Sequence, residues 1–211
     1  EVLKDRGYAT ACFGKWHLGH SSGLLPLDQG FDEFVGIPYS NDMSMARRSP
    51  QDTYKYELPF FVGNEVVEWE ANQAAFTQRF THETIRFIRE HKDERFFVYL
   101  AHPMPHVPLF RSKSFEGQSP RGIYGDVIEE IDSGMGAIMA TLDDLDLRDN
   151  TLVIFTSDNG PWVKMNLTGG SAGLFRGGKG STLEGGHRVP FIASWPRRIP
   201  EGSLNHEFIT A

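Results

Sequence analysis

The sequence of 211 residues has little cysteine, no long apolar run and no excess of basic charge. Its single cysteine, Cys12, excludes an internal disulfide framework. No apolar run approaches the roughly 18 residues of a membrane-spanning helix, and no signal peptide is visible. The formal net charge of −7 argues against nucleic-acid binding, because a nucleic-acid partner requires a basic face. With no internal repeat or low-complexity tract, a chain of this length predicts one domain with a sizeable core.

The spacing of apolar residues predicts strands and helices in alternation. We expect the end of a helix at residues 1–6 and strands at 9–13, 96–101, 152–155 and 189–193. Helices are expected at 73–91 and 122–145, where apolar side chains recur every three or four positions. Residues 20–63 are rich in Gly, Pro and Ser and predict a long irregular region that forms one wall of a substrate cleft. This order of elements predicts an α/β layered fold with a mainly parallel sheet.

A lysine and a histidine stand two residues apart just after the first predicted strand. If the strand includes Lys15 and His17, its period of two points both side chains to the same side, where they can converge on one anion. This spacing indicates an enzyme that handles an oxyanion. A lone Lys-x-His pair is also typical of a solvated loop, and the pair alone does not separate the two interpretations.

The predicted strand at 152–155 is apolar enough to be buried, and it leads into a polar turn that contains Asp158 and Asn159. In open α/β sheets, ligands bind beyond the carboxyl ends of the strands, so these two residues are well placed for a site. A carboxylate and an amide oxygen are hard ligands that suit Ca²⁺ or Mg²⁺. The same Asp-Asn-Gly sequence also forms a simple turn, because all three residues tolerate left-handed conformations.

A third segment, residues 177–190, is dense in glycine and contains Lys179, so its backbone can approach a ligand closely. It differs from a phosphate-binding P-loop, because Gly180 follows the lysine where Ser or Thr is required and no apolar strand directly precedes it. We therefore reject a nucleotide-binding loop. Lys179 taken alone is equally consistent with a solvated charge.

Five segments of the chain, in this order, match motifs of a known family. They are Gly-Tyr-x-Thr-x-x-x-Gly-Lys-Trp-His-Leu-Gly at 7–19, Gln-Gly-Phe at 29–31 with Gly-Ile-Pro-Tyr-Ser at 36–40, His-Val-Pro at 106–108, Ser-Asp-Asn-Gly at 157–160, and Gly-Lys-Gly-Ser-Thr-x-Glu-Gly-Gly at 178–186. With these motifs the chain resembles the sulfatases, in the arylsulfatase A-like branch that includes the N-acetylgalactosamine-6-sulfatases. The resemblance covers nearly the whole chain and implies an alkaline-phosphatase-like sandwich with a mainly parallel central sheet flanked by helices.

The resemblance implies a role for each matching polar residue. Lys15 and His17 correspond to the pair that contacts the sulfate and an aldehyde-derived nucleophile. Ser40 corresponds to a substrate-sulfate contact, although a plain turn serine is the simpler interpretation of that position. His106 corresponds to the histidine that binds sulfate and protonates the leaving alcohol, a role that suits a side chain titrating near neutrality. Lys179 corresponds to the second sulfate-binding lysine.

Asp158 and Asn159 correspond to two ligands of a divalent metal, with Ca²⁺ expected and Mg²⁺ possible. A sulfate ester develops negative charge on its leaving oxygen as the S–O bond breaks. Two lysines, a metal and a protonated histidine together stabilise that charge. His102, four residues before His106, does not align with the His-x-Pro motif, and we expect it either to support the residues that contact the ligand or to be structural.

The chain also departs from the family pattern. The family nucleophile is a formylglycine made from the first residue of Cys/Ser-x-Pro-x-Arg, which in relatives lies upstream of the matching segment. Cys12 lacks the Pro and Arg, and Ser194-Trp195-Pro196-Arg197-Arg198 is a chance match after the last predicted strand. The Asp-Asp pair that completes the metal site is also missing. We therefore expect residues 1–211 to be the central part of a sulfatase catalytic domain, inactive alone, without the nucleophile segment and the C-terminal subdomain.

The expected function is hydrolysis of sulfate esters of aryl compounds or sulfated sugars, and the resemblance implies a periplasmic, secreted or lysosomal location. A second hypothesis is a non-catalytic relative that keeps the fold and binds anionic sugars. A third keeps the fold but changes the ester to phosphate or phosphonate, although related phosphatases coordinate two metals with additional His and Asp ligands. The sequence leaves the natural substrate and the oligomeric state open.

Overall fold

The structure is a computed structural model that describes residues 1–45 and 57–207. It consists of two compact units, residues 1–141 and 142–211. Residues 46–56, within the region predicted to be irregular, lie outside the described residues. Among the described residues, no helix has the length and apolar character needed to cross a membrane.

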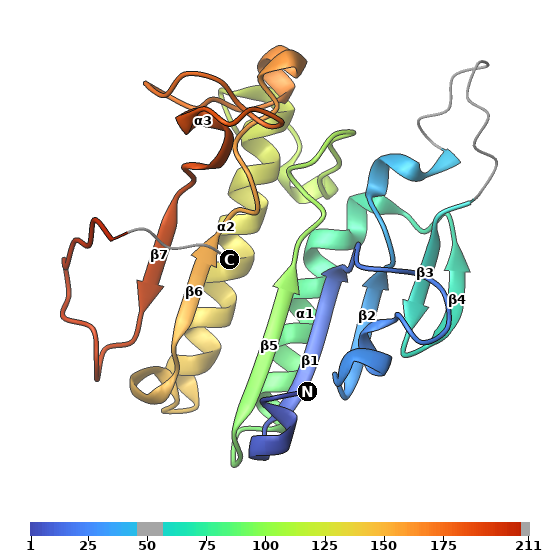
Figure 1. The fold of residues 1–211 in the computed structure, drawn as a ribbon, viewed down its shortest axis with the longest axis vertical. Helices are drawn as coiled ribbons and strands as arrows, with labels where there is room; N and C mark the ends of the chain where they lie inside the picture. Colours follow the sequence, from blue (N-terminus) through green and yellow to red (C-terminus); the bar gives the residue numbers. More distant parts are fainter. Residues whose placement is uncertain (46–56, 208–211) are drawn as a thin grey trace. The chain divides into compact units, whose positions relative to one another are not determined.

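The first unit contains a mixed sheet of five strands in the order β4-β3-β2-β1-β5 (Figure 1). The strands are β1 (Ala9–Lys15), β2 (Glu33–Ile37), β3 (Pro59–Val62), β4 (Glu65–Trp69) and β5 (Phe96–Ala101). β1 lies between β2 and β5 and is parallel to both, whereas β3 and β4 add an antiparallel hairpin at the edge next to β2. The predicted α/β fold with parallel central strands is confirmed, and the antiparallel hairpin is an addition to it.

Helix α1 (Phe76–Glu90) covers one face of this sheet and packs against β1 and β5 (Figure 1). The alternation of side chains along β1 explains why the sheet has two apolar faces. Ala11 and Phe13 belong to the apolar cluster that includes α1, and Cys12 belongs to a second cluster with Trp16. A single strand therefore contributes to the core on both sides of the sheet.

Helix α2 (Gly122–Asp144) holds the connection that follows β5. Asp126 accepts hydrogen bonds from the amides of Gly117 and Ser119, and Glu130 accepts one from the amide of Ser112. Both carboxylates are buried one helical turn apart. The connection that carries His106 is thus anchored on α2 by charge-assisted hydrogen bonds.

Two glycines allow the central strands to approach closely at their carboxyl ends. A Cβ atom on Gly36 of β2 would lie 1.9 Å from the carbonyl oxygen of Gly14 in β1. Gly14 has φ +112°, and a Cβ atom there would lie 2.0 Å from the carbonyl oxygen of Ala101 in β5. Only glycine fits at these positions, so the two residues fix the spacing of the strands where the candidate site begins.

The second unit contains an antiparallel pair of strands, β6 (Val153–Thr156) and β7 (Phe191–Ser194), and a short helix α3 (Glu184–His187). The prediction of a strand before Asp158 is confirmed, but the prediction that it is buried is wrong. Ile154 is 52% exposed and Phe155 is 41% exposed, because β6 pairs with β7 alone in a sheet of two strands.

The prediction that residues 20–63 are irregular is wrong for two segments, because β2 and β3 form within this region. Both strands are short, and β2 is stabilised by parallel pairing with β1, a contact that local composition does not reveal. The predicted helices at 73–91 and 122–145 are confirmed as α1, preceded by a short 3-10 turn (Gln73–Ala75), and as α2. The helix end expected at residues 1–6 is a 3-10 turn (Lys4–Arg6).

Candidate functional site

The first candidate residues lie where β1 ends. Lys15 is the last residue of β1, and the backbone continues beside β2 through hydrogen bonds from Trp16 N to Ile37 O and from His17 N to Pro38 O, both 3.0 Å. His17 has φ +60°, a left-handed conformation that is uncommon for residues other than glycine. The strand alternation that we expected to align Lys15 with His17 therefore stops before the histidine. Such backbone conformations cluster at functional sites.

Ser40 follows β2 and is buried. Its hydroxyl has no hydrogen-bond partner among the described residues, although its carbonyl oxygen accepts a hydrogen bond from Met43 N at 3.0 Å. A buried hydroxyl without a partner costs free energy, so it is a position where a ligand oxygen can replace water favourably. The neighbouring Tyr39 donates to Glu57 O, and burial together with the charge of Glu70 raises the pKa of Tyr39, which keeps it a neutral phenol.

His106 lies in the connection after β5 and is half-buried. Its Nδ1 atom is 2.7 Å from the carbonyl oxygen of Val107. Because a carbonyl oxygen only accepts hydrogen bonds, Nδ1 carries the hydrogen, and any proton exchange with a ligand takes place at Nε2. The ring orientation is fixed by this contact, as is common for histidines that take part in proton transfer.

These four side chains follow three adjacent parallel strands of one sheet. Gly14 of β1 pairs with Ala101 of β5, and Lys15 pairs with Ile37 of β2, so the carboxyl ends of the strands lie level with one another. Ligands in open α/β sheets bind at this edge. The first unit therefore gathers Lys15, His17, Ser40 and His106 at one end of its sheet.

The second unit joins the loops that carry the other predicted residues through backbone hydrogen bonds. Asp158 and Asn159 follow β6, and Lys179 N donates to Pro161 O at 2.8 Å, which ties the glycine-rich loop to the turn. Gly160 N donates to Gly186 O at 2.8 Å, and a Cβ atom on Gly160 would lie 1.9 Å from Gly185 O. Two loops that are distant in sequence thus form one tightly packed turn.

The side chains of this turn are open to a ligand. The carboxylate of Asp158 is exposed, and Asn159 is half-buried. The ammonium group of Lys179 lies 5.5 Å from the centre of the Trp162 ring, within the range of a cation–π interaction. Asp158 and Asn159 supply hard oxygen donors on consecutive residues, so they fit part of the coordination shell of Ca²⁺ or Mg²⁺.

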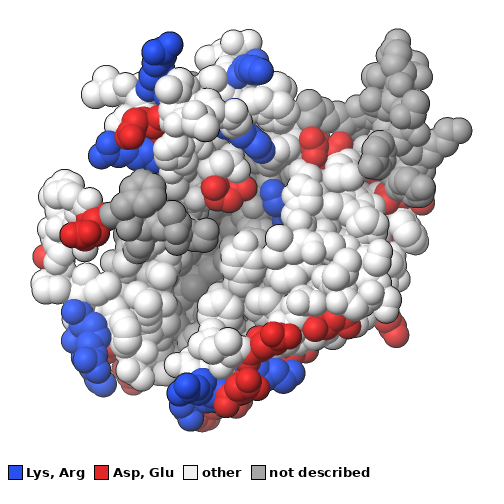
Figure 2. All heavy atoms as spheres, viewed as in Figure 1, with Lys and Arg blue, Asp and Glu red and all other residues white. Residues whose placement is uncertain are grey.

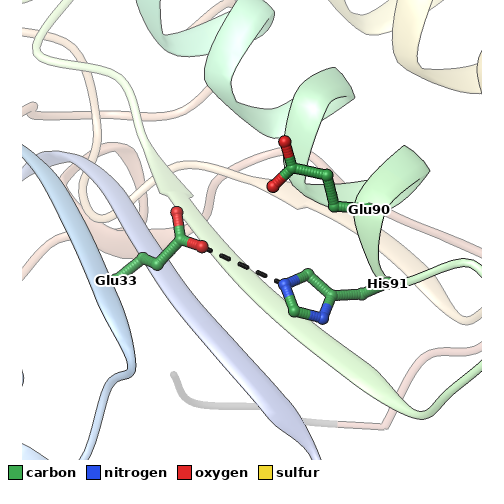
Figure 3. A group of neighbouring side chains, drawn as sticks. All are labelled: Glu33, Glu90 and His91. Carbon is green, nitrogen blue, oxygen red and sulfur yellow. Dashed lines mark ion pairs between the residues drawn. The ribbon is translucent and has the colours of Figure 1, made fainter.

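A different group of potential metal ligands lies at the opposite end of the first sheet. Glu33 begins β2, and Glu90 and His91 end α1 (Figure 3). The Nε2 atom of His91 is 4.0 Å from a carboxylate oxygen of Glu33, and Arg86 forms ion pairs with Glu33 and Glu90. Among the described His, Cys, Asp and Glu residues this is the one compact group, and the guanidinium of Arg86 offsets part of the charge of its two carboxylates while it also pairs with Glu83. Figure 2 shows acidic and basic side chains side by side along this edge of the first unit.

Cys12 and Ser194 are the two residues that could be mistaken for the nucleophile, and both have contacts that suit a structural role. Cys12 is fully buried in β1, and burial raises the pKa of its thiol to about 12. A thiol that stays protonated is a poor nucleophile. Ser194 ends β7, and its hydroxyl accepts a hydrogen bond from Arg148 Nη2 at 2.8 Å. The interpretation of Ser194-Trp195-Pro196-Arg197-Arg198 as a chance match stays a prediction.

His102 directly follows β5 and differs from His106 in its surroundings. Its Nδ1 atom is buried without a partner among the described residues, and its ring centre lies 6.5 Å from that of Phe80. Burial lowers the pKa of His102 to about 4, so the ring is neutral near pH 7. A neutral histidine has no proton to give as an imidazolium, so His102 is less suited than His106 to act as a general acid.

Three residues near the site were not predicted from the sequence. Trp162 contacts Lys179, and Asn41 and Gln73 form a buried pair next to Ser40. The position of Asn41 directly after Ser40 was a usable signal. Gln73 gave none, because its partner is 32 residues away in the sequence.

Comparisons with known proteins agree on one family. A protein-family model described as Sulfatase matches residues 1–211. The chain is 40% identical over 214 residues to N-acetylgalactosamine-6-sulfatase of Canis lupus familiaris, covering 98% of this chain and 41% of that protein. It is 37% identical over 227 residues to arylsulfatase A of Homo sapiens, covering 100% of this chain and 44% of that protein. The chain thus spans about two fifths of the length of these curated relatives.

Solved structures give the same result. The structure is similar to the PsFucS1 sulfatase from Pseudoalteromonas sp., with a TM-score of 0.79 and 29% identity, over 92% of this chain and 44% of that chain. It is also similar to Ps i-CgsB in complex with k-i-k-neocarrahexaose, with a TM-score of 0.76 and 30% identity, over 95% of this chain and 48% of that chain.

Proposed function

The chain belongs to the sulfatase family and has its alkaline-phosphatase-like fold, and from this we propose that the full-length gene product is a sulfuric ester hydrolase. The observation that carries the proposal is the placement of four polar residues, Lys15, His17, Ser40 and His106, after the carboxyl ends of three adjacent parallel strands. This is the edge of an α/β sheet at which ligands bind.

The proposed role of Lys15, His17 and Lys179 is to bind the sulfate group. Each supplies hydrogen-bond donors to the sulfate oxygens, and the two ammonium groups balance the negative charge that grows as the ester bond breaks. Ser40 adds a hydroxyl donor from a buried position that has no partner among the described residues.

The proposed role of His106 is to protonate the leaving oxygen. The carbonyl oxygen of Val107 fixes the hydrogen on Nδ1, so the proton that is transferred comes from Nε2. Sulfur forms a bond to the attacking nucleophile as its bond to the bridging oxygen breaks, the bridging oxygen receives the proton, and an alcohol leaves instead of an alkoxide. The ring returns to its neutral form with the hydrogen still on Nδ1.

Asp158 and Asn159 are the residues that would hold a divalent cation, with Ca²⁺ preferred and Mg²⁺ as the second choice. Such a cation, when bound, draws electron density from a sulfate oxygen. The family nucleophile, a formylglycine, is expected outside residues 1–211, because Cys12 is buried and lies outside any Cys-x-Pro-x-Arg signature.

The proposed substrate class is a sulfated sugar or an aryl sulfate. Relatives at 37–40% identity are named N-acetylgalactosamine-6-sulfatase and arylsulfatase A, and a structural neighbour at 30% identity holds k-i-k-neocarrahexaose. A sugar fits an open site at the end of a sheet, where loops can contact several rings.

Substitution of the two proposed contacts tests this assignment. Lys179→Ala and His106→Ala in the full-length gene product, with formylglycine verified by mass spectrometry, should each lower kcat/KM for an aryl sulfate by about 100-fold to 1,000-fold. The matched controls are Lys164→Ala and His187→Ala, since both side chains are exposed in the second unit. Wild-type turnover by either proposed variant would remove that residue from the mechanism.

A further inference from the structure

A buried pair of amide side chains lies directly behind the Ser40 and His106 segments. Asn41 is completely buried and Gln73 is 6% exposed. Asn41 Nδ2 donates to Gln73 Oε1 at 3.2 Å, while Gln73 Nε2 donates to Asn41 O at 3.2 Å and to Ser44 Oγ at 3.0 Å. The segment from Ser40 to Ser44 is therefore held on the residues that lead into α1.

The same asparagine also reaches the His106 connection. Its second amide hydrogen is donated to Pro108 O at 3.2 Å, across 67 residues of sequence. Pro108 is two residues after His106, and Asn41 is one residue after Ser40. One side chain thus joins the segments that carry two of the proposed sulfate contacts.

The hydrogen bonds of Asn41 and Gln73 can all be made in only one orientation of the two side-chain amide groups. All four amide hydrogens of Asn41 and Gln73 are donated, and each acceptor is an oxygen that cannot donate in return, except the Ser44 hydroxyl. A flip of the Asn41 amide would place its oxygen against two other acceptor oxygens in a buried, low-dielectric region. The pair therefore fixes the distance between the two segments as well as holding each one.

Asn41 acts together with other polar contacts, because Glu130 and Asp126 of α2 also anchor the connection that follows His106. The Ser40 hydroxyl has no partner among the described residues, so its position depends on the backbone beside Asn41. The His106 ring is held by Val107 O, which moves together with the same connection. The hydrogen bond from Asn41 to Pro108 O joins the segment that carries this hydroxyl directly to the connection that carries the imidazole.

We propose that Asn41 is a positioning residue that couples the Ser40 segment to the His106 connection and so sets the geometry of the sulfate site. The meaning of this coupling for catalysis rests on the proposed function, whereas the coupling itself is a property of the fold. Misplacement of a reacting group by about 1 Å can lower a rate about 100-fold, so a link of this kind is sufficient to control turnover.

The test is Asn41→Asp in the full-length gene product. Aspartate has the same shape, but it cannot donate to Gln73 Oε1 and Pro108 O and places an acceptor against both. The control is Asn72→Asp, because the exposed Asn72 side chain accepts from Ala74 N, a contact that a carboxylate preserves. Amide hydrogen exchange is followed at Met43 and His106, whose amides donate to Ser40 O and Pro103 O, and at His91, which caps α1 and donates to Phe87 O, as a reference away from both segments.

In Asn41→Asp, exchange at both Met43 and His106 should become about tenfold faster relative to His91. In Asn72→Asp all three rates should stay at their wild-type values. Faster exchange at Met43 alone would overturn the proposal, because it would show that Asn41 does not hold the His106 connection. Unchanged exchange at both sites would overturn it as well.

If Asn41→Asp loosens the whole unit, Asn41→Ser provides the same comparison with a smaller side chain and no new charge. In this second variant, the proposal would also be overturned if the exchange rates at Met43 and His106 increase no more than the rate at His91. Measurement of kcat then tests the positioning role of Asn41 apart from the proposed sulfatase activity. With folded protein and aryl sulfate, Asn41→Asp should lower kcat about 100-fold, whereas Asn72→Asp should not.

Different results would contradict the coupling through Asn41 and the proposed sulfatase activity. A wild-type protein without sulfatase activity, but with coupled exchange in Asn41→Asp, would remove the proposed function and leave the coupling intact. An active wild-type protein whose two segments exchange independently would remove the coupling and leave the function intact. An Asn41→Asp variant that retains full kcat despite faster exchange would contradict the role of Asn41 in positioning.

Discussion

At the scale of single residues, His102 is a neutral histidine with a buried Nδ1 atom and a ring close to Phe80. Burial lowers its pKa to about 4, whereas an exposed histidine titrates near 6.5. Between these values the unfolded chain binds a proton that the folded chain does not, so the free energy of unfolding decreases as the pH falls from 6.5 toward 4. Above pH 6.5 both states are neutral at this site, and the penalty is absent.

His102→Gln tests this proton linkage. The variant should lose less stability than the wild type between pH 6.5 and 4, by an amount on the order of 3 kcal/mol, because glutamine takes up no proton on unfolding. Urea unfolding at a series of pH values measures the difference. Parallel curves for the two proteins would show that His102 is protonated as readily in the folded state as in the unfolded state.

His17 combines a proposed catalytic role with a left-handed backbone, φ +60°. Such a conformation is unfavourable for alanine and free of strain for glycine. We therefore expect His17→Gly to be more stable than His17→Ala by about 1 kcal/mol, although both variants lose the imidazole and with it the activity. Thermal unfolding compares them, and an alanine variant that is equally stable would contradict backbone strain at this position.

At the scale of elements, the parallel strands owe their close approach to two glycines. Gly36→Ala would place a methyl group 1.9 Å from Gly14 O, a backbone atom that cannot rotate away. The substitution should lower the free energy of unfolding by about 3 kcal/mol or more. Chemical unfolding of the purified variant measures this loss.

The matched control is Gly136→Ala in α2, where a Cβ atom would meet nothing within 4 Å. Alanine is favoured over glycine inside a helix, so this variant should gain roughly 0.5–1 kcal/mol. A similar loss in both variants would mean that the effect of Gly36→Ala does not arise from crowding between β1 and β2.

The elements also show which parts of the fold a sequence can reveal. α1 and α2 were predicted because their apolar periodicity is local, and the strand 96–101 matches β5. β2 and β3 were missed because short strands in a glycine-rich region depend on partners elsewhere in the chain. The link between Asn41 and Gln73 was missed for the same reason. Lys15, Ser40 and His106 could be named as candidates because each lies within a recognisable motif.

At the scale of the whole molecule, the proposed site residues are divided between the two compact units. Lys15, His17, Ser40 and His106 belong to the first unit, and Asp158, Asn159 and Lys179 belong to the second. In each unit the residues follow strands and are brought together by backbone contacts. The chain spans about two fifths of the length of its curated relatives, so residues 1–211 hold part of the proposed site, and the activity is proposed for the full-length gene product.

The most direct test of this account is hydrolysis of a chromogenic aryl sulfate by the full-length gene product, co-expressed with a formylglycine-generating enzyme and assayed with and without Ca²⁺. We expect metal-dependent release of the phenol, and slower release from the corresponding aryl phosphate. With the aldehyde verified by mass spectrometry, absence of hydrolysis of the aryl sulfate and of a panel of sulfated sugars would contradict the proposed activity and favour a protein that binds anionic sugars without cleaving them.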